Sequence, residues 1–162
     1  MATTIVPAKL KMTIEEKVTL NGRERGSKNE LIKSAITQLH ERILSIPATA
    51  TTAQPIDVAN FSDAATGAGT FVDGKVSYAR ITNLDSSASI VLRFIAQSAA
   101  NSAYSVVLPA GKTHLISSMR MEVVTDGSAW AGTDELAKIE CFYETTPTSA
   151  VDLEIIIAQT AN

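Results

Sequence analysis

The stretch Val151-Asp152-Leu153-Glu154-Ile155 decides the fold, because apolar and acidic residues alternate along it without interruption. A period of two places the three apolar side chains on one face of an extended chain and both carboxylates on the other. The sequence therefore predicts a half-buried β-strand here, whose apolar side must meet a second layer.

Similar runs rich in Val, Ile, Tyr and Phe fill the chain upstream of this strand, and turn residues separate them. With the stretch itself they make seven predicted strands: 75–84, 89–96, 103–108, 113–117, 120–125, 137–144 and 151–158. Short strands at near-regular spacing are typical of an antiparallel β-sandwich or jelly roll. Strands do not alternate with long helices, which argues against a parallel α/β sheet. We therefore expect a mainly all-β fold.

The N-terminal part of the chain is predicted to be an extended arm followed by a strand. Pro7 limits regular structure in residues 1–9, whereas residues 10–20 alternate as a strand does. Asn21-Gly22 is a strong tight-turn signal, and Gly26 marks a second break. Residues 10–162 are expected to form one domain, in which a polar connector over 47–55 separates segment 10–47 from the main sandwich over 55–160.

Residues 27–46 fit two structures. Ser27 and Glu30 have the spacing of a helix capping box. Five residues then fall on one helical face: Ile32, Ala35, Ile36, Leu39 and Ile43. As an extended chain, the same segment has a face formed by Ile36, Leu44 and Ile46. We predict a short helix over 29–42 and keep a strand as the alternative. Pro47 ends either element.

Length, composition and charge indicate a folded core and limit the classes of partner that the chain can bind. A chain of 162 residues can bury roughly 70% of its unfolded surface in one core. Hydrophobic residues make up 45% and charged residues 19%, which argues against disorder. The net charge is −3 and no two Lys/Arg residues are adjacent, so we expect no nucleic-acid partner. No apolar run has membrane-spanning length, and the N-terminus lacks a secretory pattern. We expect no membrane partner, and assembly in a cytoplasm.

The cysteine, histidine and acidic residues of the chain do not form a recognisable catalytic or metal-binding motif. Cys141 lies in an apolar strand and is predicted to be a small buried hydrophobe. His40 and His114 lack metal-ligand spacing, so no metal or other cofactor is predicted. Asp152 and Glu154 are expected on the solvated side of a sheet rather than as an acid/base pair. We therefore expect no catalytic residues, and an enzyme is the weakest of the functions considered.

Five residues are candidates for partner binding. An extended arm can add a strand to a neighbour's open sheet edge, which points to Ile5 and Val6, and then to Leu10 and Met12 on the strand that follows. Trp130 lies in the small-residue loop 127–132. Its indole either folds back on the core or anchors a partner, as a buried Trp does at many interfaces.

Several segments together resemble a pattern in small virion structural proteins of tailed bacteriophages. They are Tyr78-Ala79-Arg80-Ile81-Thr82-Asn83-Leu84-Asp85, Val91-Leu92-Arg93-Phe94, the run from Leu108-Pro109-Ala110-Gly111-Lys112 to Ile116, and Val18 to Gly26. The resemblance covers about residues 10–120, and loop 127–135 departs from it. It implies a β-sandwich that is part of the particle and has no catalytic activity.

From this resemblance we expect a virion protein, namely a capsid accessory subunit of the decoration, cement or vertex type. Its expected partners are copies of itself, in a symmetric homo-oligomer, and the major capsid or tail proteins of the particle. A tail, collar or fibre-adaptor component is the alternative. A carbohydrate- or receptor-binding module is a weaker one, because aromatic residues make up only 5% of the chain.

Overall fold

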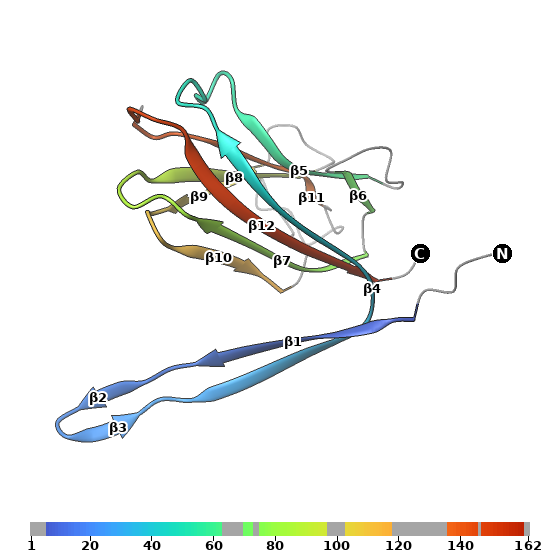
Figure 1. Ribbon diagram of the computed structural model, residues 1–162, viewed down its shortest axis with the longest axis vertical. Helices are drawn as coiled ribbons and strands as arrows, with labels where there is room; N and C mark the ends of the chain where they lie inside the picture. Colours follow the sequence, from blue (N-terminus) through green and yellow to red (C-terminus); the bar gives the residue numbers. More distant parts are fainter. Residues whose placement is uncertain are drawn as a thin grey trace, which may run out of the picture.

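The computed structural model describes residues 6–62, 70–72, 75–96, 103–117, 136–145 and 147–160, and these form an all-β protein (Figure 1). The strands are β1 (Ala8–Glu15), β2 (Val18–Leu20), β3 (Arg23–Arg25), β4 (Lys28–Ile46), β5 (Ile56–Ser62), β6 (Thr70–Val72), β7 (Val76–Asn83), β8 (Ile90–Ala96), β9 (Ala103–Leu108), β10 (Thr113–Ile116), β11 (Leu136–Phe142) and β12 (Val151–Thr160). The described residues include no helix that could cross a membrane.

Two five-stranded sheets carry the core. The first has the order β1-β4-β12-β7-β10 and the second β6-β5-β11-β8-β9. Only the pairing of β5 with β6 is parallel, among the pairings of the described strands. Apolar side chains from both sheets form one cluster, which includes Leu153 and Ile155 of the first sheet and Leu92 and Phe94 of the second.

Strand β12 lies at the centre of the first sheet and confirms the predicted alternation. Leu153, Ile155 and Ile157 are buried in the core, whereas Asp152 is exposed and Glu154 is half-buried. The strand pairs with β4 along one edge and with β7 along the other. The outer face of β12 is polar at Asp152 and Glu154 but apolar at Ile156 and Ala158, which belong to a second, smaller cluster.

The predicted helix over 29–42 is wrong, since this segment belongs to the 19-residue strand β4. Of the five residues on the supposed helical face, only Ile36 is buried. The extended conformation is favoured over a helix because it buries Leu44 and Ile46 in the core and allows residues 36–46 to pair with β12. Ser27 Oγ does not cap a helix but donates to the Glu16 carboxylate at 3.1 Å.

The first half of β4 pairs with β1 rather than with β12, and these two strands project from the body as a hairpin (Figure 1). We call residues 8–36 the β-arm. A bulge shifts the β1–β4 register near Ala35, whose φ of 62° lies in the left-handed region. A bulge of this kind bends a strand and increases its twist. The predicted arm over 1–9 overlaps β1, which begins at Ala8, and residues 1–5 of this arm lie outside the described residues.

The end of the β-arm is a tight hairpin. Asn21 and Gly22 have φ values of 52° and 74°, as the primed turn between β2 and β3 requires, which confirms the predicted turn. Where β1 passes into β2, Glu16 N donates to Ser27 O at 2.8 Å. A Cβ on Gly26 would lie 1.9 Å from Glu16 O, so only glycine permits this close approach of the two strands.

Most of the strands predicted after residue 75 are confirmed to within two residues at each end. The predicted strand over 120–125 lies outside the described residues. Strands β5 and β6 were not predicted. Residues 47–55 form the expected connector, in which Gln54 N donates to Thr51 Oγ1 at 3.2 Å.

Asn83 joins two loops at one end of the body and is fully buried. Its Nδ2 donates to Ala88 O at 2.9 Å and to Leu108 O at 3.1 Å, while its Oδ1 accepts from Asp85 N. One amide thus satisfies backbone groups on both sides of the loop between β7 and β8 and at the end of β9.

Replacing Asn83 with leucine is expected to destabilise the protein by about 2 kcal/mol, because buried carbonyls lose their donors while the side-chain volume is kept. Urea unfolding measures the change. Asn29→Leu, at an exposed position of the β-arm, serves as the control and should change stability by less than about 0.5 kcal/mol. Equal effects of the two variants would contradict the bridging role of Asn83.

Candidate functional site: an exposed β-arm

The structure does not gather the five predicted partner-binding residues into one site. Ile5 and Trp130 lie outside the described residues. Val6 is exposed just before β1. Leu10 and Met12 are half-buried and pack against a small apolar cluster of Ile36, Tyr78 and Ala158. These two residues therefore anchor the β-arm to the body.

Beyond this anchor, one face of the β-arm is apolar and exposed. Met12 lies opposite Leu31, and Ile14 lies opposite Asn29. Because directly opposed residues point to the same side of a strand pair, Leu10, Met12, Ile14 and Leu31 share a face. Ile14 is 46% and Leu31 38% exposed. These two side chains extend the anchoring row away from the body and are available to a partner.

The opposite face of the β-arm is mostly polar. Lys11 lies opposite Ile32, and Thr13 opposite Glu30. Lys11 Nζ is 2.9 Å from Glu30 Oε1, and both side chains are largely solvated. The β-arm is therefore amphipathic, although the exposed Ile32 interrupts its polar face.

Sequence reasoning missed most of the β-arm. Ile14, Val18, Leu20 and Leu31 are exposed and were not proposed as partner contacts. A signal was present, because alternating apolar residues precede Asn21-Gly22 and others follow it. Such a flanked turn indicates a hairpin. The helical interpretation of residues 29–42 removed the second strand of that hairpin.

A concave surface between two loops of the body offers little chemistry. It is an open hollow of about 410 Å³ between the loops Asp85–Ser89 and Glu144–Ser149. The Asp85 carboxylate accepts from the backbone of Ala88 and Ser87, each at 2.7 Å, and these bonds lower the pKa of Asp85. The described residues that line this hollow include no histidine or cysteine. Within the described residues, no group of three metal-ligating side chains comes together.

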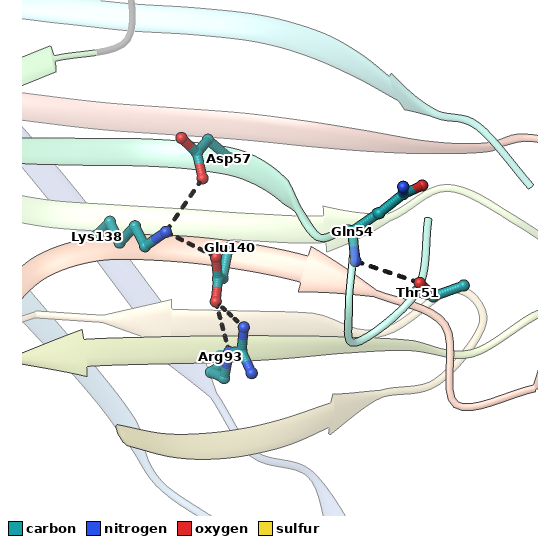
Figure 2. Close-up of polar contacts among 6 residues, drawn as sticks. All are labelled: Thr51, Gln54, Asp57, Arg93, Lys138 and Glu140. Carbon is teal, nitrogen blue, oxygen red and sulfur yellow. Dashed lines mark hydrogen bonds and ion pairs between the residues drawn. The ribbon is translucent and has the colours of Figure 1, made fainter. Parts of the chain in front are cut away.

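A ladder of alternating charges crosses the second sheet (Figure 2). Glu140 on β11 lies opposite Arg93 on β8 and Asp57 on β5. Glu140 is 1% exposed, and its Oε1 accepts from Arg93 Nε at 2.5 Å. Lys138 Nζ lies 2.9 Å from Glu140 Oε2 and 3.7 Å from Asp57 Oδ1. The Arg93 guanidinium also lies over the Phe142 ring.

This ladder has the properties of a structural network. A hydrogen bond with Glu140 raises the pKa of Lys138, so the ammonium stays charged. Both oxygens of Glu140 face cations, which compensates the cost of burying the carboxylate.

The histidines and two of the tyrosines pack against aromatic rings or bond to the backbone. His40 meets the edge of Phe71, and the half-buried His114 packs beside Phe94, where burial lowers its pKa. Tyr143 is buried, and its hydroxyl donates to Ile46 O at 2.6 Å. Tyr104 stacks on Phe94 with the ring centroids 4.6 Å apart. Tyr104 and Tyr143 therefore do not form a joint exposed platform for sugar stacking.

Cys141 is a free, fully buried thiol, as the sequence predicted. Burial, together with the nearby carboxylates of Glu140 and Asp57, raises the pKa of this thiol from 9.0 to about 12. Because the folded pKa is the higher one, the thiol's contribution to stability is complete below about pH 9 and is lost as the pH rises toward 12.

At pH 10.5, the wild type is therefore expected to lose about 2 kcal/mol more of its pH 8 stability than Cys141→Ala loses. Urea unfolding of both proteins at both pH values measures this difference. Lysines and tyrosines titrate in both proteins, so the comparison isolates the thiol. Equal losses in the two proteins would show that Cys141 is not shielded.

Comparison of the chain with protein-family models, with curated proteins and with solved structures found no significant match. The functional assignment therefore depends on the exposed β-arm, on the two sheets that carry it and on the sequence motifs.

Proposed function

We propose that this chain is a non-catalytic structural protein of a virus particle, and specifically an accessory subunit of a tailed-bacteriophage capsid that assembles as a symmetric homo-oligomer. The fold that we propose for its body is a β-sandwich of the jelly-roll kind. Two five-stranded sheets with one shared core support this class.

The exposed β-arm is the observation that carries the proposal. A two-stranded hairpin is at best marginally stable in water, and three strands or a packing partner are needed for independent stability. The β-arm nevertheless extends from the body as two strands (Figure 1). Its apolar residues Ile14 and Leu31 are exposed. A neighbouring subunit that covers this face would supply the missing layer.

The motifs that resemble those of virion proteins have structural roles in this chain. Asn83, within the Arg80–Asp85 segment, holds two loops together through its side-chain amide. In the segment from Leu108 to Lys112, Lys112 N donates to Pro109 O, and Gly111 has a φ of 66°. Residues that build turns and loops are those expected in a structural subunit, which supports the proposed function.

A body of this kind suits a particle that cannot be repaired outside the cell. Its inner faces are densely apolar, and its strand pairings join residues far apart in the sequence. Unfolding must break many such contacts together, which slows it. The body therefore supplies kinetic persistence, and the β-arm supplies attachment to neighbours.

Cryo-electron microscopy of purified particles of the virus that encodes the chain tests this proposal. Many symmetry-related copies are expected on the capsid surface, with each β-arm covered by an adjacent subunit. Density on the tail or collar would overturn the capsid placement but keep the structural role. Particles that lack the chain altogether, as judged by mass spectrometry, would overturn the proposed function.

A further inference from the structure

Charge is divided unevenly between the β-arm and the rest of the chain. Residues 8–36 contain seven of the fourteen Lys/Arg residues but four of the seventeen Asp/Glu residues. The β-arm therefore carries a formal charge of +3, and the rest of the chain carries −6, which together give the overall −3. Opposite charges of this size favour contact between the β-arm of one molecule and the body of another.

The tip of the β-arm combines apolar and cationic side chains on one face. Val18 lies opposite Arg25, and Leu20 lies opposite Arg23. Directly opposed residues point to the same side, so these four side chains form one surface, which we call the tip face. All four are exposed. Neither arginine forms an ion pair with any residue that the structure describes.

A surface of matching chemistry lies on the outer side of β4. Leu39 and Ile43 are 59% and 66% exposed, with the exposed Glu41 between them. Asp152 of β12 lies opposite Ser45 on the same outer side. We call Leu39, Glu41, Ile43 and Asp152 the acidic strip. Arg42 points the other way, because its guanidinium donates to Val58 O in the second sheet.

The acidic strip is accessible from the side. Over residues 37–46, β4 pairs with β12 along one edge, and no other described strand pairs with it. Glu154 is already paired with Arg80 at 2.5 Å, whereas Glu41 and Asp152 have no ion-pair partner among the described residues. Two solvated carboxylates and two exposed aliphatic side chains thus remain available for a partner.

We propose that the tip face of one copy docks on the acidic strip of a second copy. This inference rests on the proposed function, since it specifies how the subunits contact one another. The second copy is required because the tip lies roughly 40 Å from the bend of β4, at 3.3 Å per residue over Ala8 to Leu20. In Figure 1 the tip (β2 and β3) lies far from the body half of β4.

The contact would pair arginine with carboxylate while aliphatic side chains are buried between the two surfaces. The charges steer the encounter and fix its orientation, whereas burial of Val18, Leu20, Leu39 and Ile43 supplies most of the affinity. Because these ion pairs form near the protein surface, salt is expected to weaken the association.

Charge reversal of each surface tests the docking. R23E/R25E reverses the tip face, and E41K/D152K reverses the acidic strip. In sedimentation velocity at low salt, each variant alone is expected to associate at least 10-fold more weakly than the wild type. An equimolar mixture is expected to associate again, since an acidic tip then meets a basic strip and a basic tip meets an acidic strip. Circular dichroism confirms that both variants are folded.

The outcomes separate this inference from the proposed function. If R23E/R25E weakens association but E41K/D152K does not, or if the mixture fails to associate, the acidic strip is not the docking site. Wild-type protein that sediments as a monomer at all concentrations would also overturn the docking. The structural role in the particle is decided independently, by the presence of the chain in purified virions.

Discussion

The Ile14→Lys/Leu31→Lys variant is expected to associate with itself roughly 100-fold more weakly than the wild type and to unfold at an unchanged temperature. Both side chains lie on the apolar face of the β-arm and are partly exposed in the single chain. Burial of an aliphatic side chain contributes about 1.5–3 kcal/mol. Lysines in its place would also bring unpaired charges into the contact.

A matched variant controls for the added charge. Thr13→Lys/Ile32→Lys also adds two cations to the β-arm, but on its opposite face, where Thr13 faces Glu30. This control should retain wild-type association in sedimentation equilibrium and the same Tm. If both variants weakened association equally, the apolar face would not be the contact, and if neither did, the β-arm would not be the assembly element.

Arg93→Ala is expected to destabilise the folded chain by about 3 kcal/mol, because it removes a cation from a carboxylate that is already out of water. Glu140 is 1% exposed and lies opposite Asp57 as well as Arg93. Without the guanidinium, Lys138 alone would have to compensate both carboxylates. Urea unfolding at neutral pH measures this loss.

Glu140→Leu should cost far less, within about 1 kcal/mol of the wild type, because removing the buried charge also removes the need to compensate it. Lys138 would still be near Asp57, and Arg93 would still lie over the Phe142 ring. A larger loss of stability for Arg93→Ala than for Glu140→Leu is expected only if the Glu140 carboxylate is buried. Equal losses would indicate that the pair acts as an exposed salt bridge does.

The second half of the chain could be predicted because its strands are half-buried. In β12, alternate residues face the core and the solvent, so the pattern follows from the sequence directly. The tight turn at Asn21-Gly22 was found for a similar reason, since both residues adopt the positive φ values that favour them. At these positions the local preference of each residue matches the conformation that the folded protein requires.

The β-arm could not be predicted in the same way, because little of it faces a core. Ile32 of the β-arm is exposed in the single chain, and so are Leu39 and Ile43 on the body half of β4. The spacing of these residues therefore does not report the inner face of β4. Their helical spacing therefore did not reflect a buried face, since all three side chains are exposed. The charge ladder was also missed, since Asp57, Arg93 and Glu140 come together only through strand pairing.

Amide hydrogen exchange over residues 8–34 tests most directly whether the β-arm depends on a neighbouring subunit. In dilute, unassembled protein, these amides are expected to exchange roughly 100-fold faster than those of β7, β8 and β12, because an uncovered hairpin opens easily. Assembly should slow their exchange to a rate near that of the body. A β-arm that is already as protected as the body in dilute solution, or one whose exchange is unchanged by assembly, would contradict the account.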